Sequence, residues 1–316
     1  MLKLLIIGLG RQGHKHFLAS KKLEEEGLLQ IVGICDIKKN DEINKPFYSD
    51  YKKAIEEVQP DAVIISTTND THFDISSFCI KNGIHVLKEK PMNLNMDDAR
   101  KLLKLAKENK CILKVAQQRF FKQNYIVARN WLPDVGEIDL IDYKFTLSND
   151  TYSWYCNNKN GGGSWYGLGW HACFVINWFF GNPNDISVVM KTIDNIKDTN
   201  VDNVDLATIH FNNKSIGRIL TSSAYDKKQE SFFVHGKSGS ILVEDKDIFL
   251  YDNNGLILQH RTINHDSMYP YIKQIKDFLK NIDNKKEFVD LLSYKTMAML
   301  YAGIKSANNN SEFIKV

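Results

Sequence analysis

Three glycines near the start of the chain have the spacing of a phosphate-binding turn. Gly8, Gly10 and Gly13 form the pattern GxGxxG between the apolar run KLLIIGLG and a helix-like segment that begins near residue 11. The first glycine allows a tight turn, the second lets the backbone approach a pyrophosphate, and the third permits close helix–strand contact. The helix start then offers unpaired N–H groups to the phosphates. The pattern predicts dinucleotide binding, and the alternative is a glycine-rich turn that binds nothing.

An acidic residue after the second strand-like run predicts contact with the adenosine ribose. Asp36 follows the run LQIVGIC, and its carboxylate could accept hydrogen bonds from ribose hydroxyls while repelling a 2′-phosphate. This favours NAD(H) as the cofactor. Lys38 and Lys39 weaken the preference, because either ammonium could pair with a 2′-phosphate, so NADP(H) stays possible. A helix-capping or solvated role is the alternative for Asp36.

A lysine after a later strand-like run could take part in proton transfer. Lys90 lies between Glu89 and Pro91, and Pro91 restricts the backbone just ahead of it. Ligands of open α/β sheets bind beyond the carboxyl ends of the strands. There the Lys90 cation could stabilise a developing alkoxide, or its neutral form could take a proton. Read in isolation, a lysine at a strand end is more often a solvated surface residue. Four polar residues share this strand-end position and are expected to face the cofactor: Ser66, Thr67, Thr68 and Asn69.

The elements that must position these residues alternate in type over the first third of the chain. Strand-like and helix-like segments follow each other up to about residue 118, which predicts βαβ units and a parallel doubly wound sheet. Later strand-like runs are separated by short turns, which predicts an α+β domain with an antiparallel or mixed sheet. Helices are expected over 162–180, 267–282 and 287–306. The predicted domains are residues 1–119, which bind the dinucleotide, and 120–316, which bind the substrate and mediate oligomerisation.

Composition and charge limit the classes of function. The 316 residues are 43% hydrophobic and 25% charged, which is typical of a soluble globular protein. A net charge of +3 gives no electrostatic case for nucleic acid or a membrane surface, and no apolar run approaches the length of a membrane span. The N-terminus is interrupted too soon for a signal peptide. The five cysteines form no CxxC pair, so neither a disulfide framework nor a metal site is expected, and a cytoplasmic location is the simplest inference.

Five segments in this order give the chain a family resemblance: GLGRQGHKH, STTNDTH, EKPMNLN, QQRF and VGEI. Together they resemble the Gfo/Idh/MocA family of NAD(P)-dependent oxidoreductases, over residues 4 to about 181. The resemblance implies an N-terminal Rossmann domain and a C-terminal domain with an open, mainly antiparallel sheet. It also implies a sugar, cyclitol or nucleotide sugar as substrate, and a homo-oligomer that is a dimer or tetramer.

The resemblance adds residues to the predicted site. The lysine of EKP is the family's usual catalytic or substrate-binding residue, which implies that role for Lys90. The histidine that closes GxGxxGxxH corresponds to His16. The histidine after the third strand corresponds to His72, for which a role as a helix-start residue is equally open. Besides the three glycines, the residues expected at the cofactor are Arg11, Gln12, Asp36, Ser66, Thr67, Thr68, Asn69, His72, Glu89 and Lys90.

The segment GGGSWYGLGWH, residues 161–171, corresponds to the start of the family's substrate-side helix. Many members carry a glycine run followed by DxGxHxxD. Here the motif's glycine and histidine correspond to Gly169 and His171, whereas Gly167 and Phe174 stand in place of its aspartates. An aspartate four residues before a histidine would share its helix face and raise the basicity of the imidazole. Gly167 can do neither, and a glycine within a helix predicts an irregular first turn.

Three functions remain open at this point. The first is an oxidoreductase that transfers a hydride between nicotinamide and a carbinol or carbonyl carbon, with Lys90 and His171 in proton transfer. The second is a reductase of an imine or another activated carbonyl, which needs less help from a base. The third is a non-catalytic regulatory protein that binds NAD(P) and a ligand, against which the retained Lys90 argues. For His171 alone, a core histidine bonded to a backbone carbonyl is the alternative.

Substrate contacts are expected from the region around this glycine-rich segment. The expected residues are Arg119, Tyr155, Trp165, Tyr166 and Gly167. Tyr155 or Tyr166 could supply the contact that the missing aspartate would make. Trp154, Trp165 and Trp170 could form a flat apolar platform for a sugar ring, with at least one of them expected in the ordinary core.

Overall fold

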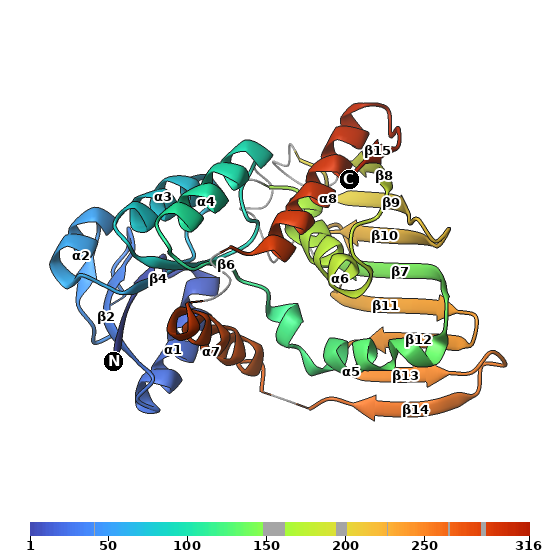
Figure 1. Ribbon diagram of the computed structural model, residues 1–316, viewed down its shortest axis with the longest axis horizontal. Coiled ribbons are helices and arrows are strands. Elements are labelled where there is room, and N and C mark those ends of the chain that lie inside the picture. The colour runs from blue at the N-terminus through green and yellow to red at the C-terminus, as the bar shows by residue number, and fades with distance from the viewer. Residues whose placement is uncertain (41, 148–161, 194–200, 226, 265, 286–288) are drawn as a thin grey trace. The chain divides into compact units, whose positions relative to one another are not determined.

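The computed structural model describes the chain except for residues 41, 148–161, 194–200, 226, 265 and 286–288 (Figure 1). The described residues form two compact units. Residues 1–121 and 266–291 make up the first, and residues 122–265 and 292–316 make up the second. Each unit contains one of the two sheets.

The first unit contains a six-stranded sheet in the order β3-β2-β1-β4-β5-β6, and all neighbouring strands are parallel. The predicted doubly wound sheet is thereby confirmed. Its strands are β1 (Leu2–Ile7), β2 (Leu29–Cys35), β3 (Phe47–Tyr48), β4 (Ala62–Ile65), β5 (His85–Lys88) and β6 (Leu113–Val115). Its helices are α1 (Arg11–Glu25), α2 (Tyr51–Val58), α3 (His72–Lys81), α4 (Met96–Glu108) and α7 (Tyr269–Asn284), with short 3-10 turns at Asn69–Thr71 and Gln118–Phe121.

The strands of this sheet are apolar because both of its faces are covered by helices. Successive side chains of β1 point to opposite faces. Leu4 and Ile6 pack with residues of α1 and α7, whereas Leu5 and Ile7 pack with residues of α2, α3 and α4. This two-sided core fixes the carboxyl ends of β1, β4 and β5, where the predicted cofactor residues begin.

Helix α7 lies beside α1 in the first unit, although the division at residue 119 assigned it to the second domain (Figure 1). Tyr271, Ile275 and Phe278 recur at helical spacing and are buried against the apolar side chains of β1 and α1. The chain thus returns to the first sheet after building most of the second. Periodicity identified the helix but could not show which sheet covers its apolar face.

The second unit contains a nine-stranded sheet in the order β14-β13-β12-β11-β7-β10-β9-β8-β15. Only the β7–β10 pair is parallel among these neighbours, so the prediction of a mainly antiparallel sheet is confirmed. Its strands are β7 (Ile138–Thr146), β8 (Asp185–Lys191), β9 (Val204–His210), β10 (Ile216–Ser222), β11 (Gln229–Gly236), β12 (Gly239–Glu244), β13 (Asp247–Tyr251), β14 (Ile257–Thr262) and β15 (Ile314–Lys315). Its helical segments are α5 (Gln123–Trp131), a 3-10 turn at Leu132–Val135, a π-helical turn at Trp165–Gly169, α6 (Trp170–Phe180) and α8 (Leu291–Asn308).

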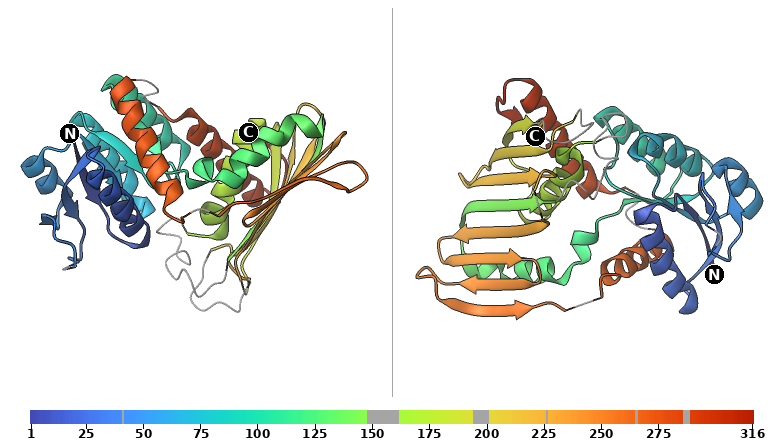
Figure 2. Two further views of the ribbon diagram at one scale, coloured as in Figure 1. Left: turned by 90° about the horizontal axis from the view of Figure 1, so that it is seen from below. Right: turned by 180° about the vertical axis from the view of Figure 1, so that it is seen from behind.

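Helices cover one face of this second sheet, and the views in Figure 2 show no helix over its other face among the described residues. Along β7, Ile141, Tyr143 and Phe145 are buried, while Leu140 is exposed and Lys144 is partly exposed. This alternation is typical of a sheet with one covered and one bare face. Among the described helices, none is both long and apolar enough to span a membrane.

Candidate cofactor and active site

The glycine turn has the geometry that a dinucleotide requires. Gly8 has a positive φ of +90°, and a Cβ there would lie 2.6 Å from the carbonyl carbon of Ser66. A Cβ on Gly13 would lie 2.0 Å from the carbonyl oxygen of Gly8. At Gly10, by contrast, a Cβ would meet no described atom within 4 Å. The turn is therefore closed at its first and third glycines and open at its second, where a pyrophosphate would need to approach.

The first turn of α1 is suited to an anion. Gly10 is its N-cap, no side chain caps the helix, and its first turn contains no acidic residue. The backbone N–H groups at this end therefore face no competing carboxylate within the helix, and the helix dipole adds a positive potential. Arg11 is exposed, whereas the Gln12 side chain accepts a 2.8 Å hydrogen bond from the Tyr271 hydroxyl of α7. The residues of the turn thus fit the phosphates of a dinucleotide.

The Asp36 carboxylate is fixed beside the glycine turn. Its Oδ2 accepts a 2.5 Å hydrogen bond from the Leu9 N–H, and its Oδ1 accepts a 2.9 Å bond from the Lys38 N–H. Each oxygen keeps a second lone pair, so the carboxylate can still accept bonds from ribose hydroxyls. Contact of Asp36 with the adenosine ribose stays a prediction.

Polar residues after β4 support the glycine turn. The Ser66 hydroxyl donates a 2.8 Å hydrogen bond to the Gly8 carbonyl, and the Thr67 and Thr71 hydroxyls are 2.7 Å apart. Asn69 is buried at the start of a 3-10 turn, while Thr68 is exposed. Ser66 therefore holds the turn itself.

His72 begins α3 and is buried, as its alternative role at a helix start predicted. Its Nε2 is 3.2 Å from the Thr67 carbonyl oxygen. Burial lowers the pKa of His72 well below its usual value, and the nearby Lys88 and Lys90 cations lower that pKa further. His72 is therefore a neutral imidazole at neutral pH, and its contact with the cofactor stays a prediction.

His16 and Glu89 form a buried pair that joins α1 to the end of β5. The His16 Nε2 is 2.9 Å from the Glu89 Oε1, which also accepts a 3.3 Å bond from the Gln118 amide. Burial opposes the charged form of Glu89, but the hydrogen bond and charge of His16, together with Lys90, lower the pKa of Glu89 below its usual value. The Glu89 carboxylate thus points inward and fixes the segment that carries Lys90.

Lys90 is partly exposed just beyond β5, at the edge where three strands end together. Ile7 of β1 pairs with Ile65 of β4, and Ile65 pairs with Lys88 of β5. The residues that follow these three strand ends are therefore neighbours: the glycine turn, the Ser66 segment and Glu89-Lys90. The structure brings the predicted cofactor residues and Lys90 to one edge of the first sheet. Arg119 is buried in the 3-10 turn at Gln118–Phe121 of the same unit.

In the second unit, His171 lies on the first turn of α6 and is partly exposed. Its ring packs edge-on against Phe145, near the carboxyl end of β7, with ring centroids 5.9 Å apart. His171 is therefore not fully buried, and its role in proton transfer stays a prediction.

The turn before α6 is irregular, as Gly167 predicted. Residues Trp165–Gly169 form a π-helical turn, and the Gly167 N–H donates a 3.0 Å bond to the Gly163 carbonyl. Single π-helical turns within helices often occur at functional sites. Burial raises the pKa of Tyr166 to about 12, with smaller contributions from Tyr301 and Asp202. Tyr166 is therefore a neutral phenol that can donate a hydrogen bond.

The prediction of Trp165 as a substrate platform is wrong. Its indole is fully buried, and its Nε1 donates a 2.9 Å bond to the Leu300 carbonyl. A Cβ on Gly169 would lie 2.8 Å from the ring, and one on Gly303 would lie 2.6 Å from it. These glycines make room for a core indole, so no face is left for a sugar. Trp170 is also fully buried, while Trp154 and Tyr155 lie outside the described residues.

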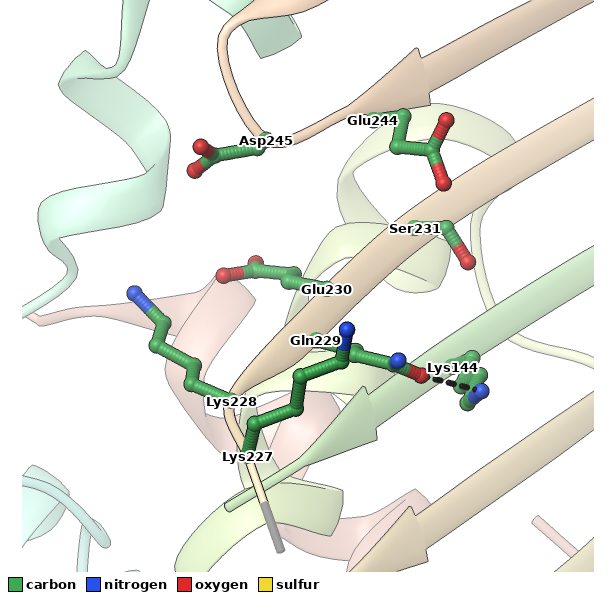
Figure 3. A pocket seen from close by; sticks show the side chains of 8 residues that line it. All are labelled: Lys144, Lys227, Lys228, Gln229, Glu230, Ser231, Glu244 and Asp245. Carbon is green, nitrogen blue, oxygen red and sulfur yellow. Dashed lines mark hydrogen bonds between the residues drawn. The ribbon is translucent and has the colours of Figure 1, made fainter. Parts of the chain in front are cut away.

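A pocket of about 420 Å³ lies where β7 and β12 end and β11 begins (Figure 3). Its lining residues are Lys144, Lys227, Lys228, Gln229, Glu230, Ser231, Glu244 and Asp245. Lys144 donates a 2.6 Å bond to the Gln229 amide oxygen. Lysines and carboxylates are equal in number among these eight residues, so their charges offset one another. None of the eight belongs to the predicted site.

Comparison with protein families decides the classification. Residues 2–117 match the family described as "Oxidoreductase family, NAD-binding Rossmann fold", and residues 133–242 match the "GFO/IDH/MocA C-terminal domain". The two matched segments together span more than half of the chain; the first contains all six strands of the first sheet, and the second contains part of the second sheet. The chain belongs to the Gfo/Idh/MocA family.

Three known proteins that this chain resembles are distant from it in sequence. It is 28% identical over 202 residues to "Uncharacterized oxidoreductase YhhX" of Escherichia coli, covering 62% of this chain and 56% of that protein. The matched part thus spans little more than half the length of that relative. The solved structure of levoglucosan dehydrogenase with NADH and levoglucosan is similar over 100% of this chain and 99% of that chain, with a TM-score of 0.86 and 18% identity. The WlbA dehydrogenase of Bordetella pertussis, in complex with NADH and UDP-GlcNAcA, is similar over 100% and 97%, with a TM-score of 0.85 and 15% identity.

Where many members of the Gfo/Idh/MocA family carry an aspartate, this chain has Gly167, but carboxyl groups reach the same turn from another element. Asp202 accepts a 2.7 Å bond from the Trp165 N–H and so caps the π-helical turn. Asp205 of β9 is buried and accepts hydrogen bonds from the hydroxyls of Ser164 and Thr221. Burial raises the pKa of Asp205 well above its usual value, and the neighbouring Asp202 raises that pKa further. Neither aspartate is predicted from the sequence, because nothing in VDNVD distinguishes them from solvated loop residues.

Proposed function

We propose that this chain is an NAD(H)-dependent oxidoreductase that acts on a carbinol or carbonyl carbon of a sugar, cyclitol or nucleotide sugar. The observation that carries the proposal is the edge of the first sheet, where the open glycine turn, Asp36 and Lys90 follow neighbouring strands. The sugar-like substrate class rests on the ligands in the two solved relatives.

NAD(H) is preferred over NADP(H) because of the environment of Asp36. Its carboxylate is held by the N–H groups of Leu9 and Lys38, so it cannot readily turn away from the ribose. A 2′-phosphate would then face a fixed negative charge. We expect NADH to bind at least tenfold more tightly than NADPH, and equal affinities would contradict this role of Asp36.

Bound NAD(H) supplies the hydride chemistry, and the chain's own residues supply binding, orientation and proton transfer. In the first unit, the Lys90 ammonium stabilises negative charge on the substrate oxygen, or its neutral amine accepts the proton of the hydroxyl. In the second unit, His171 is partly exposed and is the proposed second group in proton transfer. Tyr166 stays protonated at neutral pH, so it can donate a hydrogen bond to the substrate but does not act as a phenolate base.

Substitution of Lys90 tests the catalytic assignment. Purified protein is screened for NAD⁺ reduction and NADH oxidation with a panel of sugars, cyclitols and nucleotide sugars. With an active substrate, Lys90→Met should lower kcat by about 100-fold or more, the usual contribution of positioned acid–base groups, while NADH affinity changes little. His171→Ala should lower kcat by a similar factor. Full activity in Lys90→Met would refute the assignment.

A second candidate is the reduction of an imine or another activated carbonyl. It is favoured by Gly167, because no carboxylate at that position raises the basicity of His171. Activity on cyclic imines, with none on polyols, would identify this reaction. Saturable NADH binding with no turnover of either panel would instead favour a regulatory, ligand-binding role.

Self-association stays a prediction, as a dimer or tetramer. Leu140, Ile216 and Leu206 are exposed on neighbouring strands of the second sheet. Their strand register places them on the same face, which also carries the Arg218–Asp142 ion pair. Light scattering of the purified protein at micromolar concentration should give a multiple of 36.4 kDa. A monomeric mass would refute the prediction.

A further inference from the structure

A second lysine lies two residues before Lys90, and it is fully buried. Lys88 is the last residue of β5 and has no exposed surface. Its ammonium donates hydrogen bonds to the Met92 carbonyl and to the Asn93 side-chain oxygen, the latter at 3.0 Å. Met92 and Asn93 are themselves buried. Lys88 thus holds the segment that directly follows Lys90-Pro91, and we call this pair of hydrogen bonds the clasp.

Burying a lysine is costly, which makes its presence at this position informative. Charged groups lose their hydration in the protein interior, and an apolar side chain would fill the end of β5 without that cost. The two residues before Lys88 follow this expectation, since Val86 and Leu87 are apolar and buried. Both acceptors of Lys88 are neutral oxygens, so the lysine does not serve to neutralise a buried carboxylate. Its hydrogen bonds instead hold residues 92 and 93 in their conformation.

We propose that Lys88 is a positioning residue that fixes the segment after Lys90 and thereby sets the direction of the Lys90 side chain. The inference rests on the proposed function, in which Lys90 moves or stabilises the substrate proton. Glu89 fixes the same segment from the other side, because its carboxylate bonds His16 and accepts a 3.2 Å bond from the Lys90 N–H. The backbone around Lys90 is therefore held by the buried side chains of Lys88 and Glu89.

The charges around Lys88 determine how this clasp responds to pH. His72 of α3 faces it as a neutral imidazole, and Lys90 and the Glu89–His16 pair are the neighbouring charged groups. Burial lowers the pKa of Lys88 to about 7. Above that pH the ammonium becomes an amine with one fewer donor, so its two bonds weaken. The clasp is therefore strongest below pH 7.

Hydrogen exchange measures the clasp without any substrate. In the full-length protein, amides of residues 92–95 should exchange about tenfold or more faster in Lys88→Met, because hydrogen bonds from a charged donor are lost. Asn93→Leu, which removes one acceptor, should accelerate the same amides. Combining the two should add little beyond the larger single effect. Lys101→Met is the matched control, since Lys101 is exposed on α4, and it should leave these amides unchanged. Unchanged exchange in both Lys88→Met and Asn93→Leu would overturn the inference.

Turnover then distinguishes a positioning role from a merely structural one. With a substrate in hand, Lys88→Met should lower kcat by at least tenfold while NADH affinity stays within about threefold. Wild-type kcat should fall above pH 7, and this limb of the pH profile should be absent in Lys88→Met. If Lys90→Met retains full activity while Lys88→Met still exchanges faster, the proposed function fails and the clasp stands. If Lys90→Met is inactive and Lys88→Met keeps wild-type kcat and pH profile, the positioning role fails.

Discussion

Replacing Gly10 with alanine separates cofactor binding from stability. Gly10 has φ of −63° and ψ of −169°, which an alanine adopts without strain, and its Cβ would meet no described atom within 4 Å. Gly→Ala at a compatible position stabilises a protein by about 0.4–1 kcal/mol through the unfolded chain. The methyl group would nevertheless occupy the space that a pyrophosphate needs. Loss of one charge-assisted hydrogen bond, about 1.5–3 kcal/mol, lowers NADH affinity by about tenfold or more.

The same substitution at Gly13 should give the opposite result. Its Cβ would lie 2.0 Å from the Gly8 carbonyl oxygen, so α1 must move away from the turn. Overpacking costs about 1–3 kcal/mol, and we expect about 2–3 kcal/mol here because a backbone oxygen cannot rotate aside as a side chain can. The gain in helix propensity of about 1 kcal/mol offsets part of the cost. We expect a net loss of about 1–2 kcal/mol, or roughly 2–8 °C in Tm for a unit of this size.

Calorimetry and NADH fluorescence titration check the pair together. Gly10→Ala should keep or raise Tm and lose NADH affinity, whereas Gly13→Ala should lower Tm. Wild-type NADH affinity in Gly10→Ala would refute the placement of the phosphates at this turn. An unchanged Tm in Gly13→Ala would refute the packing argument.

Three further substitutions test buried contacts by measurement of Tm, and for the first two Tm is measured across a pH series. Asp205 has a raised pKa, so the folded state holds a proton that the unfolded chain loses near pH 3.8, and stability falls as pH rises above that value. Asp205→Asn should remove this slope, and parallel curves for the two proteins would contradict it. Glu89 has a lowered pKa, so its stabilisation is present above pH 4.5 and is lost as pH falls further. Glu89→Gln should therefore cost about 1.5–3 kcal/mol at pH 7 through the His16 bond and less below pH 4, whereas a constant cost would argue against a charged Glu89. Gly303→Ala places a Cβ 2.6 Å from the Trp165 ring and should lower stability by about 1–2 kcal/mol, and a wild-type Tm would show that the indole has room to move.

Sequence patterns predicted those parts of the fold that depend on neighbouring residues. Glycine spacing identified the cofactor turn, because each glycine there is required by a contact within the same strand–turn–helix unit. Gly167 predicted an irregular helix start because a glycine within a helix is unfavourable, which again depends only on the local sequence. The strands β3 and β15, each of two residues, and α5 were not predicted, since their periodicity is too short or too weak.

Other features depend on contacts between residues far apart in the chain, and the sequence could not show them. Trp165 resembled a substrate platform until Gly303 and the Leu300 carbonyl were found against its ring. Lys88 was not singled out from the sequence, because nothing in the run IHVLKEKP shows that its side chain is buried. Asp205 gave no such signal, because its burial depends on β10 and on the turn before α6.

Titration of the purified protein with NADH, followed by addition of the sugar, cyclitol and nucleotide-sugar panel, tests the central claim most directly. The account predicts saturable NADH binding, and either NAD⁺ reduction or NADH oxidation with at least one member of the panel, which Lys90→Met lowers by about 100-fold or more. Absence of saturable binding of either NADH or NADPH would contradict it.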